Sequence, residues 1–396
     1  MKSRPKILTY LIHLALFGAA WFTTMLAGAE LLTGHVWLYD LEWSHFWEGW
    51  PYSVAFLTFL TFHEFGHYFT AVYHKVRTSL PYYIPIYIPG IGFNIGSMGA
   101  VISLKQVPGT TRKFFDIGIA GPLAGFVVSL FLLGYGFTHL PPLEDKILAI
   151  HPEYVEQFGG VPTEAEMQTF LEEENQQAVA IGSSLLFEFC KDYLAPDPNR
   201  VPPPFELMHY PFLFVGFITL FFTALNLLPI GQLDGGHVMY GLFGRRNAGI
   251  IARLATVALL LIGGTGFWGF QHVDAYSFAM LGGYCLFTIY VFSKIFRDRR
   301  WHIIAIGAGL MFGLQAVLKF NFPDWEVNPL WLLYTFLVVR VIKLDHPPAR
   351  LEQPLDLPRK VLGWLAIVIF VLCFTPNPVQ VIGVQDFEQV EQGIDQ

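Results

Sequence analysis

The fold is decided by one apolar run at residues 52–73, which reads YSVAFLTFLTFHEFGHYFTAVY. About 20 mostly apolar residues form a helix that is long enough to cross the hydrocarbon core of a membrane. The second half of the run carries three ionisable side chains, His63, Glu64 and His67. Because such side chains are costly inside a membrane and mark functional sites there, the run predicts a membrane helix with a chemical role.

The rest of the chain is similarly apolar. Of its 396 residues, 54% are hydrophobic and 14% are charged, and the mean hydropathy is +0.47. This composition excludes an ordinary soluble enzyme and predicts an all-α polytopic membrane protein. We expect about nine transmembrane helices, at residues 7–32, 52–73, 114–137, 210–230, 250–268, 277–295, 303–318, 330–342 and 361–374.

The basic residues set the expected orientation, because Lys and Arg are disfavoured in short outside loops. An N-terminus on the inner side leaves few of the 24 Lys and Arg residues outside: Lys146, Lys191, Arg200 and Lys319. The tail after residue 375 then lies outside. The first run has an alternative reading as a signal peptide, since Ala27, Gly28 and Ala29 resemble a cleavage site, but its apolar length favours a retained helix.

These spans divide the chain into five expected segments. They are an N-terminal helix with an outside loop (1–50), core helices with the HEFGH motif and a hairpin (51–137), an acidic outside insert (138–208), a core helix with an LDGG motif (209–246), and C-terminal helices with an outside tail (247–396).

Residues 81–105 predict a membrane-associated β-hairpin between the second and third transmembrane helices. Apolar residues alternate along the stretch, Pro85 and Pro89 exclude a helix, and glycines such as Gly96 and Gly99 supply turns or bulges. Non-helical backbone at membrane depth must line a cavity or be buried in protein. The alternative is an ordinary interfacial loop.

The outside insert is the one sizeable polar region, and most of its charged residues are acidic. We expect one or two amphipathic helices at residues 164–184 and few strands. The insert either has a separate role or only links two spans.

The motif at residues 61–67 has the spacing of a zinc site. Two histidines four residues apart lie on one face of a helix, so His63 and His67 can bind one Zn²⁺ ion, and Glu64 is placed to accept a proton from water. A structural polar cluster or a proton relay is the alternative.

A catalytic zinc site needs a third protein ligand, and Asp234 is the best candidate. It follows the fourth expected span in the stretch NLLPIGQLDGG at residues 226–236, at the inner side and therefore at the same depth as the histidines. On its own, Asp-Gly-Gly is only a turn signal.

Together these motifs resemble the site-2 protease family of intramembrane zinc metalloproteases, over roughly residues 50–245. The family pairs H-E-x-x-H with a later N-x-x-P…L-D-G segment, and GPLAG at residues 121–125 resembles its small-residue middle helix. The resemblance implies that His63, His67 and Asp234 bind zinc, that Glu64 is the acid/base residue and that Asn226 contacts the substrate or oxyanion. We count Asn94 in the hairpin as a candidate contact of the same kind. The insert is too short and too poor in strands for the PDZ domain that many members carry there.

The implied activity is zinc-dependent hydrolysis of peptide bonds in or near transmembrane segments, as in regulated intramembrane proteolysis. We expect membrane-protein substrates and the lipid bilayer as partners, and no nucleic acid. An edge strand at residues 98–104 is a candidate to pair with an unwound substrate. Because the N-terminus lacks a transit-like composition rich in Ser and Arg, we expect the inner membrane of a bacterium, with the N-terminus cytoplasmic.

Three other functions compete with this one. The membrane zinc protease of prenylated proteins completes its site with a glutamate, and no fitting inner-face glutamate follows the motif. A transporter or metal channel predicts polar residues spread over several helices, whereas the spans after residue 250 are almost free of acidic residues. An inactive relative is disfavoured by the intact Glu64.

Overall fold

The computed structural model describes residues 6–89, 94–265, 275–296, 300–322, 328 and 330–383. The expected outside tail extends to residues 384–396, which lie outside the described residues, as do residues 266–268 at the end of the fifth expected span.

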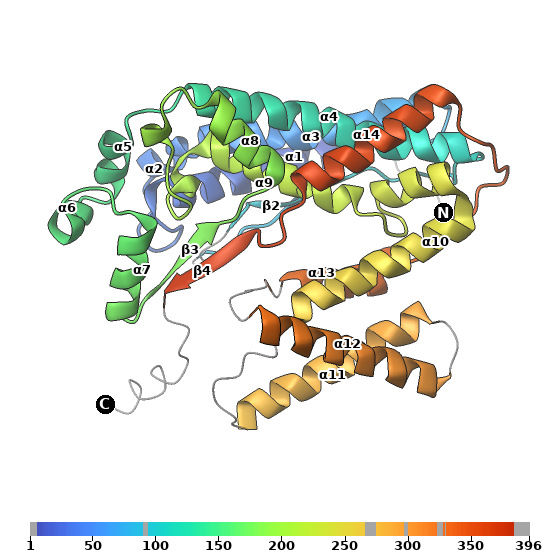
Figure 1. Ribbon diagram of the computed structural model, residues 1–396. Helices are drawn as coiled ribbons and strands as arrows, with labels where there is room; N and C mark the ends of the chain where they lie inside the picture. The colour runs from blue at the N-terminus through green and yellow to red at the C-terminus, as the bar shows by residue number, and fades with distance from the viewer. Residues whose placement is uncertain are drawn as a thin grey trace.

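Most of the described chain is helical (Figure 1). The helices are α1 (Lys6–Thr33), α2 (Trp43–Glu48), α3 (Trp50–Tyr73), α4 (Thr111–Thr138), α5 (Leu143–Ile150), α6 (Glu153–Phe158), α7 (Glu164–Glu173), α8 (Leu185–Leu194), α9 (Pro211–Leu227), α10 (Asp234–Gly264), α11 (Ala275–Ile295), α12 (Trp301–Asn321), α13 (Leu330–Leu337), which continues into a π-helical turn (Val338–Ile342), and α14 (Leu357–Cys373). Two 3₁₀ turns, η1 (Pro198–Arg200) and η2 (Leu207–His209), precede α9.

Each apolar run expected to span a membrane overlaps one of these helices, and the run 210–230 extends beyond α9 at both ends. By length and composition, five helices of the described chain can cross a membrane: α1, α4, α10, α11 and α12. Shorter apolar helices are α9 and the run Leu330–Ile342. The count of nine transmembrane helices therefore stays a prediction.

The core is a layer of helices around α3. Helix α3 contacts α1, α4 and α9, and α4 also packs against α9 and α10. Helices α11 and α12 lie against one another, apart from this layer, with α10 between (Figure 1). Large side chains such as Phe56, Phe115 and Phe214 are fully buried between the core helices. The HEFGH motif thus lies on a helix that packs against three other helices.

Helix α10 is bent at Gly244, whose φ of 75° and ψ of 170° interrupt the helical geometry. Only glycine adopts such angles without a steric cost. The bend separates the short first part, which begins at Asp234, from the long apolar second part.

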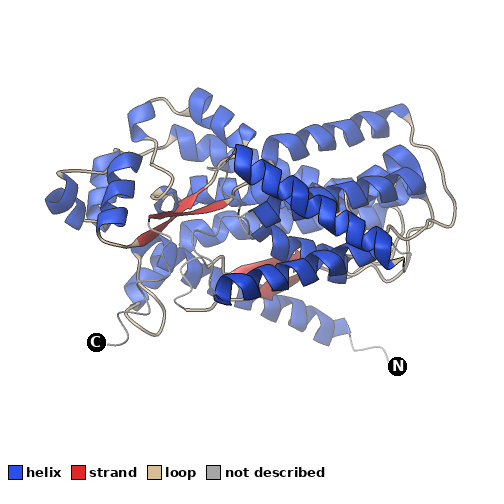
Figure 2. Cartoon of the chain, turned by 60° about the horizontal axis from the view of Figure 1, so that its bottom comes forward, coloured by secondary structure: helices blue, strands red, loops and turns tan. Residues whose placement is uncertain are grey.

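Two small antiparallel sheets accompany the helices (Figure 2). Strand β1 (Tyr82–Pro85) pairs with β2 (Ser97–Val101) between α3 and α4. Tyr52 and Thr61 of α3 hold this hairpin, through hydrogen bonds from Tyr52 Oη to Ile95 O (2.8 Å) and between Thr61 Oγ1 and Tyr83 Oη (2.7 Å). Its association with a membrane stays a prediction.

The second sheet corrects one expectation. Strand β3 (Gln177–Ile181) of the insert pairs with β4 (Val379–Gly383) after α14, so the fold is not all-α apart from one hairpin. Residues 164–184 form one helix, α7, within the expected one or two, and the stretch after it pairs with a strand about 200 residues later in the chain. Local sequence patterns carry no signal for such a distant partner.

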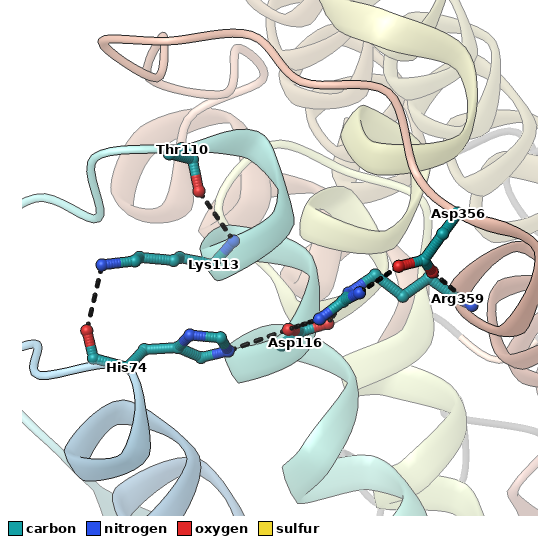
Figure 3. Close-up of polar contacts among 6 residues, drawn as sticks. All are labelled: His74, Thr110, Lys113, Asp116, Asp356 and Arg359. Carbon is teal, nitrogen blue, oxygen red and sulfur yellow. Dashed lines mark hydrogen bonds and ion pairs between the residues drawn. The ribbon is translucent and has the colours of Figure 1, made fainter.

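The N-terminal end of α14 is held to the core by ion pairs and hydrogen bonds (Figure 3). Asp116 of α4 accepts hydrogen bonds from Arg359 Nε and Nη2, each at 2.7 Å, and from His74 Nε2 at 2.8 Å. Arg359 also pairs with Asp356. One carboxylate therefore joins the ends of α3 and α14 to α4.

Candidate metal centre and its cavity

His63 and His67 lie one turn apart on α3, so both rings leave the same face of the helix. Their Nε2 atoms are 3.1 Å apart. The carboxylate of Asp234 meets them from α10: its Oδ2 lies 3.6 Å from His63 Nε2 and 3.3 Å from His67 Nε2. The structure thus brings the three expected ligand residues together.

The connection between α9 and α10 delivers Asp234 to this place. Helix α9 ends at Leu227, the chain turns, and Asp234 is the first residue of α10. A carboxylate in the first turn of a helix is stabilised by the partial positive charge of the helix N-terminus. The sequence Asp-Gly-Gly, a turn signal when read alone, here starts a helix.

The three donor atoms fit a zinc ion. Two ligand atoms each about 2.0–2.1 Å from a tetrahedral ion lie about 3.3 Å apart, close to the observed edges of 3.1, 3.3 and 3.6 Å. His67 Nδ1 donates to Ile117 O at 2.6 Å, which leaves the lone pair of Nε2 directed at the centre. Two nitrogens and one oxygen leave a fourth position open for substrate or water.

Glu64 lies beside this group without joining it. His63, Glu64 and His67 are 5%, 7% and 7% exposed. So many buried ionisable groups are costly unless a cation or hydrogen bonds compensate them. The Glu64 carboxylate lies next to the backbone amide of Ile102, just beyond β2.

All four residues line one cavity of about 490 Å³. Its other walls come from β2, the end of α9, the start of α10, and Tyr334 of α13. Asn226 lines the cavity near the end of α9. Asn94 is not among the lining residues: its side chain donates to Ile88 O at 2.8 Å within the hairpin. A contact between Asn94 and substrate stays a prediction without support from this geometry.

Two further histidines lie at the site and were not predicted from the sequence. His237 lines the cavity, and its Nδ1 lies 2.6 Å from Nε2 of His346. A signal existed for His237, since a residue three positions after Asp234 on a helix lies near it on the same face. His346 had none, because it comes from the linker before α14.

The small-residue segment at residues 121–125 lies in α4 where that helix packs on α3. A Cβ on Gly125 would come within 2.8 Å of the Phe59 ring and 3.3 Å of His63 Nδ1. Small residues let two membrane helices approach closely. Helix α4 therefore forms the back wall behind the two histidines.

Comparisons with known proteins match the part of the chain that builds this site. The family model described as Peptidase family M50 matches residues 51–265. The probable chloroplastic zinc metalloprotease EGY1 of Oryza sativa subsp. japonica is 29% identical over 222 residues, which are 54% of this chain and 32% of that protein. EGY1 of Arabidopsis thaliana is 29% identical over 216 residues, 53% of this chain and 32% of that protein.

The probable chloroplastic zinc metalloprotease EGY2 of Oryza sativa subsp. indica is 26% identical over 262 residues, 66% of this chain and 41% of that protein. The chain thus matches only about a third to two fifths of the length of these curated relatives. No solved structure matches the chain.

Proposed function

Because the chain belongs to peptidase family M50, we propose that it is a zinc metalloendopeptidase that hydrolyses peptide bonds in or near the transmembrane segments of other proteins. The family match confirms the resemblance to site-2 proteases. The apolar helices and the family together make the chain an integral membrane protein. The observation that carries the proposed activity is the convergence of His63, His67 and Asp234 beside Glu64 in one cavity.

In this proposal His63, His67 and Asp234 hold the zinc ion. Bound zinc supplies a Lewis acid, which polarises a peptide carbonyl and makes water reactive near neutral pH. Glu64 accepts a proton from the attacking water and delivers it to the departing amine nitrogen. Asn226, on the cavity wall, donates a hydrogen bond to the substrate carbonyl as negative charge develops on its oxygen.

A helical substrate must unwind before it reacts, because its carbonyls are occupied by helical hydrogen bonds. Strand β2 lines the cavity, and in the described chain only its β1 side is paired. We assign the other edge of β2 to the extended substrate, by strand addition. Substrate bound there lies next to Glu64, because Ile102 directly follows β2 and its backbone amide is next to the Glu64 carboxylate.

The pairing of β3 with β4 supports the proposed topology. It requires the insert and the residues after α14 to lie on one side of the membrane. Both are outside when the N-terminus is inside, so cleavage near the inner face releases a product inward. The relatives named above are chloroplastic, so they give no support to the expected bacterial inner membrane.

The test is to purify the full chain in detergent, measure zinc and assay a panel of single-span substrates. Glu64→Gln is expected to keep zinc and to lose about 10²- to 10⁴-fold in cleavage rate, the usual contribution of an acid/base residue. Glu164→Gln, an exposed position of α7, is the matched control and keeps full activity. Undiminished cleavage by Glu64→Gln would overturn the mechanism.

A further inference from the structure

A second group of potential metal ligands lies in the insert, away from the first. It consists of His151, Glu206 and His209, whose ligand atoms all lie within 4.8 Å of one another. His151 follows α5, Glu206 immediately precedes the 3₁₀ turn η2 that leads into α9, and His209 is the last residue of that turn. In a 3₁₀ turn the side chains at positions i and i+3 eclipse, so Glu206 and His209 project in the same direction.

The geometry of this group matches that of the first one. His151 Nε2 and His209 Nε2 are 3.2 Å apart, and Glu206 Oε2 lies 3.4 Å from His209 Nε2 and 3.8 Å from His151 Nε2. These edges are close to the separation of about 3.3 Å between two ligands of a tetrahedral zinc ion. The corresponding edges of the first group are 3.1, 3.3 and 3.6 Å.

The surrounding residues orient two of the three ligands, His151 and Glu206. His151 Nδ1 donates to Glu153 Oε1 at 3.0 Å, which leaves the Nε2 lone pair free to face the other two ligands. Tyr154 Oη donates to Glu206 Oε1 at 2.8 Å and so fixes the carboxylate, with Oε2 turned to the imidazoles. Carboxylate and hydroxyl partners of this kind typically orient the ligands of protein metal sites.

Hydrogen bonding alone leaves the group incompletely satisfied. Glu206 is 1% exposed, its Oε2 makes no hydrogen bond, and within the described chain no Lys or Arg pairs with it. A proton shared between the two histidines makes a hydrogen bond only between their Nε2 atoms and leaves the two contacts of Glu206 Oε2 without one. A divalent cation bound by all three ligand atoms satisfies each of them and compensates the charge of the buried carboxylate.

We propose that His151, Glu206 and His209 bind a second divalent metal ion of the zinc class. Two imidazole nitrogens and one carboxylate oxygen are a donor set that zinc prefers. The ion joins the end of α5 to the turn before α9. The two sites lie at opposite ends of α9, whose 17 residues span about 25 Å, so the second ion acts as a structural clamp on the insert and not in the cavity.

Zinc content of the full chain, purified in detergent without chelators, tests this proposal. We expect two zinc equivalents per chain in the unaltered protein and one in His151→Ala, a partly exposed position chosen to spare the fold. His139→Ala, an exposed histidine that precedes the insert helices, is the matched control and keeps two. One equivalent in the unaltered protein, undiminished in His151→Ala, would overturn the second site.

A titration with Co²⁺ separates the two sites. In the double variant His63→Ala, His67→Ala we expect one tight Co²⁺ equivalent with a visible ligand-field absorption band, and an increase in Tm. Adding His151→Ala should abolish the band and the increase. Because neither measurement involves proteolysis, the second site stands or falls independently of the proposed activity. Absence of the band in the double variant, or its survival in the triple variant, refutes the assignment.

Discussion

Gly121 of α4 lies directly against the imidazole of His67 of α3, with no space between the two helices for a side chain at residue 121. A Cβ there would overlap the ring atoms of His67. The same ring is held on its Nδ1 side by the carbonyl of Ile117 in α4. Helix α4 therefore fixes the orientation of a proposed zinc ligand on a neighbouring helix.

Replacing Gly121 by Ala should displace the His67 ring. We expect zinc affinity to fall by about 10-fold or more, the usual effect of disturbing the residues that orient a ligand, with a matching loss of cleavage. The measurement is a zinc-binding titration of the purified variant.

The matched control for this variant is Gly134→Ala in the same helix, where a Cβ would meet no atom within 4 Å. Alanine favours a helix over glycine, by up to about 1 kcal/mol, so this control should bind zinc normally and be at least as stable. Normal zinc affinity in Gly121→Ala would show that the ring position is not set by this contact.

Asp234→Ala tests the third ligand. Because this carboxylate is the third of three proposed zinc ligands, its loss should lower zinc affinity by more than about 100-fold, beyond the range typical of outer-shell residues. A competition titration with a chelator of known affinity measures the change. Asp197→Ala, an exposed aspartate of the insert, is the control. Zinc bound as tightly by Asp234→Ala as by the unaltered chain would remove Asp234 from the site.

Proline substitutions test strand addition at β2. The N–H groups of successive residues in a strand point to opposite edges, so of Ala100→Pro and Val101→Pro one removes an N–H group from the unpaired edge. We expect that variant to cleave transmembrane substrates up to about 10-fold more slowly, the effect of losing one hydrogen bond, while zinc content is unchanged. Equal cleavage by both variants and the unaltered chain would exclude β2 as the substrate-binding edge.

Asp116→Asn tests the ionic connection between α4, α3 and α14 (Figure 3). The change removes a half-buried charge that accepts two hydrogen bonds from Arg359, so we expect a loss of about 1.5–3 kcal/mol in unfolding free energy. Thermal unfolding in detergent measures it as a lower Tm.

The control for this change is Asp197→Asn, whose carboxylate lies 3.5 Å from Arg200 on the surface, with side chains 45% and 48% exposed. Such surface pairs contribute about 0–1 kcal/mol, so its Tm should barely move. Equal Tm shifts in the two variants would contradict a special role for Asp116.

Part of the site could be predicted because its information is local. The spacing of His63, Glu64 and His67 places them on one turn of a helix whatever surrounds it. The apolar runs likewise predict helices, because a membrane leaves the backbone no other hydrogen-bond partners. Asp234 could be predicted from its expected depth in the membrane, because the number of spans and the distribution of Lys and Arg place it at the same membrane face as the histidines.

Other features depend on segments that are distant in the sequence. The pairing of β3 with β4, the approach of His346 to His237 and the meeting of His151 with Glu206 and His209 join residues from separate elements. No local periodicity distinguishes these residues from ordinary polar residues of loops and helix ends.

The sequence by itself thus determined the membrane class of the protein, its long apolar helices and the two histidines with their glutamate, because short-range geometry and the lack of water in the bilayer dictate them. Only the tertiary structure decided which atoms converge: the 3.3 Å contact of Asp234 with His67, the unpaired edge of β2 in the cavity, and the second triangle before α9. Such meetings follow from the packing of whole helices, where close contacts such as that of Gly121 with His67 fix how the elements lie against one another.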